Sequence, residues 1–145
     1  MSDHRNLDQG IYIRLVTTRE PIKRAFAGTG KSRRRERSSA HWIAKSIVEG
    51  ILGNHRIERN GGAVGETEII DMLAEELWKV PEQTARDLVE IDANKRDAAK
   101  ASITQVLLTA LLDRYECTFF KPEYRGMGAS SYRSKGTEPP TSESV

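Results

Sequence analysis

The sequence predicts a mainly α-helical fold with a small β component, in which a four-helix domain carries short strands near its ends. Three observations lead to this fold class. Apolar residues recur at four-residue spacing in Ile69, Leu73 and Leu77, which is the period of a helix with one buried face. The same pattern continues from Ala99 to Leu111. Residues 82–121 contain neither glycine nor proline, so little in that stretch interrupts a helix.

The amino-terminal part predicts a short strand followed by a flexible arm. In residues 11–16 apolar side chains alternate with Tyr12 and Arg14, and such alternation of β-branched and aromatic residues is typical of a strand. Pro21 then opens a helical turn that reaches Phe26, because a proline in the first turn loses no hydrogen bond. We expect residues 1–39 to form this strand and arm, residues 40–133 a helical core domain with a carboxy-terminal hairpin, and residues 134–145 a disordered tail.

The arm, residues 28–39, has no apolar side chain and should be mobile. Five of its residues are cations: Lys31, Arg33, Arg34, Arg35 and Arg37. On a flexible arm each of them can neutralise a phosphate, so the segment favours nucleic acid as a partner, although many charge runs only aid solubility. The stretch Gly28 to Ser32 is not a complete phosphate-binding loop, because Ala25 stands where that motif requires glycine.

We expect four helices, near residues 40–52, 67–80, 81–91 and 94–115. Their apolar rows predict a core that includes Ile47, Ile51, Leu73, Leu77, Leu88, Ile103, Leu107 and Leu111. Between the first two helices, Asn60-Gly61-Gly62 predicts a turn of a small hairpin that uses Ile57 and Val64. Trp42, at the junction of arm and core, either packs in the fold or stacks on a base.

The order of elements is compatible with a winged helix-turn-helix domain. Asp92 is a suitable N-cap for the last helix, whose first turns would then expose recognition residues: Lys95, Arg96, Lys100, Ser102 and Gln105. Residues 116–121 predict a strand, and residues 130–133 a second strand of a wing. The wing carries cations beside aromatic residues: Lys121, Tyr124, Arg125, Tyr132 and Arg133. A plain helical bundle with a peripheral hairpin explains the same residues equally well.

The strands at 11–16 and 116–121 are too short to stand alone, and we expect them to pair with each other or across a dimer.

Charge is segregated along the chain, although the net charge is only +2. Residues 1–60 contain 13 Lys and Arg against 6 Asp and Glu, residues 61–92 contain 2 against 9, and residues 93–145 contain 8 against 6. The basic first part suits a polyanionic partner. The same distribution also allows two copies, or two halves of one copy, to attract each other.

Little in the sequence points to catalysis, a metal or a cofactor. The single cysteine, Cys117, lies in an apolar stretch and reads as a packed thiol, and His4, His41 and His55 are scattered. No apolar run approaches the roughly 20 residues that span a bilayer, and the first residues lack the layout of a secretory signal, so we expect a cytoplasmic protein.

These features predict a nucleic-acid-binding protein that is not an enzyme, with DNA favoured over RNA. It would act as a transcriptional regulator or as an accessory factor of a mobile element, and it would form a homodimer if the terminal strands pair between copies. The candidate nucleic-acid-binding residues are Lys31, Arg33, Arg34, Arg35, Arg37, Lys95, Arg96, Lys100, Gln105, Arg125 and Arg133. We expect all of them to be exposed, so that replacing them leaves the fold intact. The alternative is a protein-interaction module, an inhibitor or assembly factor, whose acidic helical face at residues 66–92 docks on a basic partner.

Overall fold

The computed structural model describes residues 4–121, and within that range the chain forms six helices and three strands. In chain order the elements are α1 (Leu7–Thr17), α2 (Glu20–Ala27), α3 (Arg37–Leu52), β1 (His55–Arg59), β2 (Gly62–Ala63), α4 (Glu66–Trp78), α5 (Glu82–Asp87), α6 (Ala93–Arg114) and β3 (Glu116–Phe119). Helices dominate and the strands form one small antiparallel sheet, so the predicted fold class is confirmed. The predicted second wing strand at 130–133 and the predicted tail lie outside the described residues.

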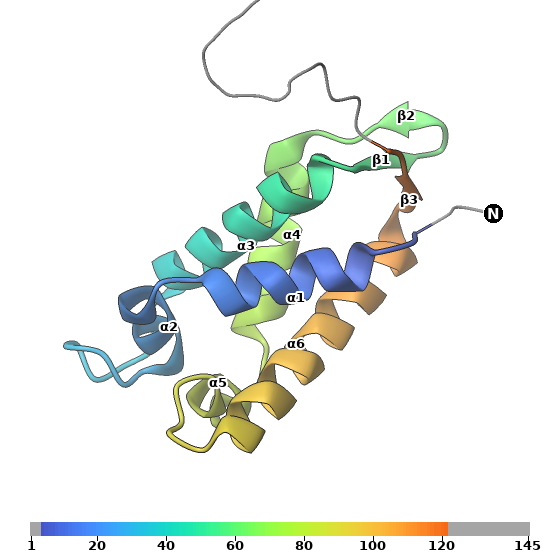
Figure 1. Ribbon diagram of the computed structural model, residues 1–145. Helices are drawn as coiled ribbons and strands as arrows, with labels where there is room; N and C mark the ends of the chain where they lie inside the picture. Colours follow the sequence, from blue (N-terminus) through green and yellow to red (C-terminus); the bar gives the residue numbers. More distant parts are fainter. Residues whose placement is uncertain (1–3, 122–145) are drawn as a thin grey trace, which may run out of the picture.

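The four longest helices surround a common core (Figure 1). α1 packs between α3 and α6, and α4 contacts both α3 and α6. The small sheet lies at one end of this group, whereas α2 and α5, which contact each other, lie at the other end. The loop between α2 and α3 extends from the end that α2 and α5 form.

The four predicted helices are present as α3, α4, α5 and α6, of which α5 is shorter than expected. All of the residues that we predicted for the core are buried: Ile47, Ile51, Leu73, Leu77, Leu88, Ile103, Leu107 and Leu111. The side chain of Asp92 accepts a hydrogen bond from the backbone N–H of Asn94 at 2.9 Å, as expected for the N-cap of α6. The turn predicted after Pro21 is also present, as α2.

The predicted amino-terminal strand is wrong, because residues 11–16 belong to α1. Leu7, Ile11 and Leu15 are four residues apart and at most 2% exposed, so they form the buried row of a helix. Ile13, which a strand would place on the same face as Ile11, is 58% exposed. The helical period starts at Leu7, inside a segment that we expected to be loose. If only residues 11–16 are considered, Leu7 is left out and the apolar residues show only the alternation of a strand.

Besides this buried row, two further contacts join α1 to the rest of the fold. The backbone oxygen of Arg5, just before the helix, lies 2.8 Å from Nε2 of His55 in β1, and that histidine is 1% exposed. Near the other end of α1, the side chain of Arg14 crosses α3 at Gly50 so closely that a Cβ atom there would lie 2.5 Å from Arg14 Nε. A glycine at position 50 therefore leaves room for the Arg14 side chain to lie across α3.

The sheet has the strand order β2-β1-β3, with antiparallel pairing throughout. The predicted hairpin is present as β1 and β2, and Asn60 (φ 54°) and Gly61 (φ 81°) take the positive φ values of its turn. The predicted strand after α6 is present as β3, and Ile57 of β1 pairs with Cys117 of β3. The predicted pairing of the two terminal strands is wrong, because β1 is the partner of β3 and residues 11–16 are helical.

Candidate nucleic-acid interface

The basic loop, residues 28–36, is tied to the fold by Arg35. The Nε atom of Arg35 donates to the backbone oxygen of Phe26 at 2.9 Å. Its Nη1 atom donates to the backbone oxygen of Val80 at 3.1 Å, and Nη2 lies 3.4 Å from that of Leu77. These carbonyls lie where α2 and α4 end, a position at which a cation interacts favourably with the last backbone oxygens of a helix.

Aromatic rings and a glycine complete the Arg35 site. The guanidinium carbon lies 4.7 Å from the ring centre of Phe26 and 4.9 Å from that of Trp78, which are distances of cation–π contacts. Gly28 ends α2 with φ 86°, and a Cβ atom at Gly28 would lie 3.2 Å from the backbone N of Arg35. Burial lowers the pKa of the Arg35 guanidinium, whereas Glu82 raises it. We expected Arg35 to lie on a mobile arm, and this prediction is wrong because the side chain is half-buried between α2 and α4.

The Arg35 anchor leaves three cations of the basic loop exposed: Lys31, Arg33 and Arg34. Between residues 4 and 121, none of these three side chains makes an ion pair. Backbone hydrogen bonds close the loop, from Arg33 N–H to Gly30 oxygen at 3.0 Å and from Glu36 N–H to Ala25 oxygen at 3.0 Å. The three cations therefore point to solvent from a loop whose base is fixed.

The exposed side of α3 continues from this loop. His41, Trp42 and Lys45 are exposed there, and Trp42 is 59% exposed. The expectation that Trp42 packs in the fold is therefore wrong. Arg37, at the start of α3, instead faces α4: its Nη1 atom lies 2.6 Å from a carboxylate oxygen of Glu75, and its guanidinium carbon lies 5.0 Å from the ring centre of Trp78.

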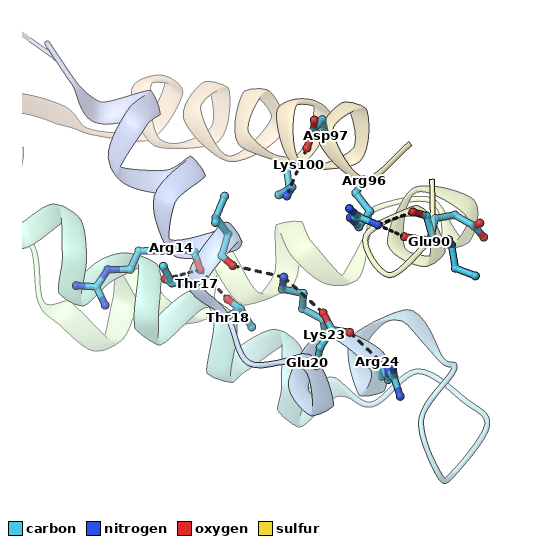
Figure 2. A network of polar contacts seen from close by, with 12 residues as sticks. Arg14, Thr17, Thr18, Glu20, Lys23, Arg24, Glu90, Arg96, Asp97 and Lys100 are labelled. Atoms are coloured by element: carbon cyan, nitrogen blue, oxygen red, sulfur yellow. Dashed lines mark hydrogen bonds and ion pairs between the residues drawn. The ribbon is translucent and has the colours of Figure 1, made fainter. Parts of the chain in front are cut away.

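The candidates on α6 divide into two groups. Lys95 and Gln105 are exposed, as predicted, and so is Ser102. Arg96 instead donates to the backbone oxygens of Glu90 and Ile91, at 2.8 and 2.7 Å (Figure 2). The side chain of Lys100 is only 12% exposed and lies beside Tyr12 of α1. The prediction that Arg96 and Lys100 are exposed is thus wrong, because the first half of α6 packs against α1 and α5. Arg125 and Arg133 lie outside the described residues.

In the described part of the chain, ion pairs involve four of the nine carboxylates of the acidic middle segment, residues 61–92. Arg37 pairs with Glu75, and Arg59 pairs with Glu68 at 2.5 Å. Tyr115 also donates to Glu68, at 3.0 Å, and the hydrogen bonds from Arg59 and Tyr115 lower the pKa of the Glu68 carboxyl. Further pairs join Glu76 to Lys79 and Arg114, and Glu82 to Arg86. Attraction between two halves of one copy, which the charge distribution allowed, is therefore present.

The described residues offer little for catalysis. They contain no group of three or more His, Cys, Asp or Glu placed to hold a metal ion. Cys117 is fully buried, and burial raises the pKa of its thiol to about 11, so it is protonated near neutral pH. Across residues 4–121, no helix is both long enough and apolar enough to cross a membrane.

Sequence reasoning missed two features of this surface. Trp78 holds both Arg35 and Arg37, and Lys23 of α2 lies close to Arg96 and Lys100. Neither residue carries a local motif, because each acquires its neighbours from elements that are distant in the sequence.

Comparisons of the sequence with protein-family models and curated proteins, and of the structure with solved structures, gave no match.

Proposed function

We propose that the protein binds nucleic acid, with DNA favoured over RNA, through the exposed cations of the basic loop. The observation that carries this proposal is the exposure of Lys31, Arg33 and Arg34 without an ion pair in the described part of the chain. Each cation that meets a phosphate releases a condensed counterion, and this release favours binding without regard to sequence. Because Arg35 already fixes the base of the loop, less conformational entropy is lost on binding.

Trp42 supports the same proposal from α3. The residue is large, apolar and 59% exposed, and Lys45 is exposed one turn further along the helix. Stacking of a base on such a ring stabilises a single-stranded complex by about 1–3 kcal/mol. The loop and this part of α3 are consecutive in the chain, and we propose that they contact the same bound strand, the loop through its phosphates and Trp42 through one base.

The acidic face is a weaker candidate for the binding surface. Glu68, Glu75, Glu76 and Glu82 make ion pairs within the chain. Such surface pairs are weak individually, at about 0–1 kcal/mol. A basic partner protein would nevertheless have to displace Arg37 and Arg59 before it reached Glu75 and Glu68. An interaction module that acts through residues 66–92 is therefore the second choice.

Transcriptional regulation, or assistance to a mobile element, is the biological role that we propose for a DNA-binding protein of this size. This role depends on binding being established first. Homodimerisation is a separate expectation, which lost its expected strand at residues 11–16 because that segment is helical, and sedimentation of the full chain measures it.

The experiment is a binding titration of the full chain, by fluorescence anisotropy, with labelled duplex DNA, single-stranded DNA and RNA. We expect binding at about 50 mM salt that weakens steeply as salt rises, because the contacts are to phosphates. Replacing Trp42 by Ala should weaken binding to single strands more than to duplex, whereas Ile91→Ala, which removes another exposed apolar side chain, should not. Absence of binding to all three probes at about 50 mM salt would contradict the proposal and favour the acidic-face alternative.

A further inference from the structure

A groove of about 340 Å³ lies between α1 and α6. Tyr12 and Ile13 of α1 line one wall, and Ala101 and Gln105 of α6 line the other. Ile13 is 58% exposed at the edge of the groove, and Val16, one turn further along α1, is 44% exposed. The outer side of α1 is therefore apolar at positions where a solvated helix usually carries charge.

The exposed side of α6 beside this groove is also uncharged. Residues 101–112 contain no Asp, Glu, Lys or Arg, although these residues make up 30% of the chain. Within that stretch Ala101, Gln105 and Thr109 are exposed and recur at four-residue spacing, so they form one row along the helix. An uncharged helix surface that borders an apolar groove is typical of a surface that meets another protein.

Charged residues of opposite sign lie at the two ends of this face. Lys95 is in the first turn of α6 and Asp113 is in the last turn, and both are exposed. They are 18 residues apart, which is about five helical turns, so they lie on the same side of the helix. Within residues 4–121, neither of them makes an ion pair.

Both residues stand at the helix end where the helix dipole disfavours their charge. The amino-terminal end of a helix favours anions, and the carboxy-terminal end favours cations. Asp8 adds to the negative end of the face, because it lines the groove and α1 begins near the end of α6 (Figure 1). A helix that packed antiparallel to α6 and carried the same charges would place an anion beside Lys95 and a cation beside Asp113. A second copy of α6 has its charges in this order.

We propose that two copies of this chain associate through the groove between α1 and α6, with the two α6 helices antiparallel. Lys95 of one copy meets Asp113 of the other, and the two-fold axis passes near Gln105, about halfway between them. A two-fold interface uses the same surface of both copies. The face suits this arrangement because it has both a groove and a protruding apolar side chain, Ile13, which enters the groove of the other copy.

The interface uses one face of two helices in each copy, so it is small and the association is weak. The core of each copy is complete without the other, and the monomer folds alone. The test is sedimentation equilibrium of the full chain without nucleic acid. We expect the average mass to rise from monomer to dimer as the protein concentration rises from about 1 to about 500 μM.

One pair of matched variants locates the interface. Ile13→Glu should abolish the dimer, because it places a carboxylate in the apolar contact. Trp42→Glu introduces the same charge at a residue of α3 that is 59% exposed, and it should leave the association unchanged. Circular dichroism at low concentration shows that both monomers are folded.

Exchange of the end charges tests the antiparallel arrangement. Lys95→Asp and Asp113→Lys should each weaken the association about tenfold, because like charges then meet at both ends of the interface. The double variant should restore it, since each pair again has opposite signs. Each new charge suits the dipole at its own end of α6, so neither substitution should unfold the monomer.

Three results would overturn the proposal. A monomer at every concentration would favour a different protein as the occupant of the groove. Undiminished association of Ile13→Glu would place the contact between copies elsewhere. A double variant that associates no better than the single ones would contradict the antiparallel pairing of α6.

Discussion

The guanidinium of Arg35 stabilises two helix ends at once. It donates to the backbone oxygen of Phe26 in α2 and to those of Leu77 and Val80 where α4 ends, and it lies against the rings of Phe26 and Trp78. Only arginine combines a planar group with donors enough to reach several carbonyls while stacking on an aromatic face. Its role therefore differs from that of its neighbours Arg33 and Arg34, although the sequence shows three consecutive arginines.

We expect Arg35→Ala to destabilise the protein by about 1–3 kcal/mol, because it removes the Arg35 donor from the backbone oxygens of Phe26 and Val80. Arg35→Lys should recover only part of that loss, since an ammonium cannot reproduce the fork of donors. The neighbouring exposed residue provides the control: Arg34→Ala should change the free energy of unfolding by less than about 0.5 kcal/mol. Urea unfolding measures all three. Equal stability of Arg35→Ala and Arg34→Ala would show that Arg35 does not anchor the loop.

At this scale the sequence identified exposed cations but not their partners. Lys31, Arg33 and Arg34 were predicted to be exposed, and they are. The local sequence did not distinguish Arg35 from these three cations, because its partners Leu77, Trp78 and Val80 lie more than 40 positions further along the chain. A partner that only tertiary packing brings close leaves no pattern in the sequence around the arginine.

At the scale of elements, α1 is the clearest case of two periods that compete in one segment. Ile11, Ile13 and Leu15 fit a strand, and Leu7, Ile11 and Leu15 fit a helix. Burial separates the two, because Ile11 is fully buried while Ile13 is 58% exposed. In α3, α4 and α6 the apolar rows have no competing alternation, and for them the period alone was sufficient. Strand pairing could not be derived in the same way, since both β1 and a segment at 11–16 offered β3 an apolar neighbour.

A pair of substitutions in α1 distinguishes the helix from a strand. Ile11→Glu should destabilise the protein severely, by more than about 3 kcal/mol, because it buries an unpaired carboxylate in the core. Ile13→Glu should be tolerated within about 0.5 kcal/mol, because that position faces solvent. Thermal or urea unfolding gives both values. A strand would bury both residues on one face, so similar large losses for the two variants would contradict the helix.

At the scale of the whole molecule, the segregated charges meet across the fold. The basic first part contributes Arg37 and Arg59, and the acidic middle contributes Glu75 and Glu68 as their partners. The sequence allowed this outcome together with two others, an external polyanion and a second copy. It could not choose among them, because the choice depends on which surfaces the helices bring together. Lys31, Arg33 and Arg34 of the basic loop make no ion pair in the described part of the chain, and these three cations form the candidate interface.

The Glu68 site should make stability depend on pH. Hydrogen bonds from Arg59 and Tyr115 lower the pKa of Glu68 below its ordinary 4.5, so the folded state prefers the carboxylate. This contribution is present above the unfolded pKa, near 4.5, and is lost as pH falls through the lower folded value. The advantage of the wild type over Glu68→Gln in urea unfolding should therefore be larger at pH 7 than near pH 3.

The control for this prediction is Glu66→Gln, because Glu66 is exposed and makes no ion pair within residues 4–121. It should show no comparable change with pH. A wild-type advantage over Glu68→Gln that is the same at both pH values would mean that the hydrogen bonds to Glu68 do not stabilise the folded state.

Nucleic-acid binding by the basic loop is tested most directly by the salt dependence of the affinity in two triple variants. One replaces Lys31, Arg33 and Arg34 by Ala and keeps the Arg35 anchor. The other replaces Arg19, Lys79 and Arg86, exposed cations outside the loop, and removes the same charge. If the loop holds phosphates, the slope of log affinity against log salt becomes shallower by about 0.9 for each lost contact in the first variant, and by much less in the second. Slopes that fall equally in both variants, or in neither, would contradict binding through the loop.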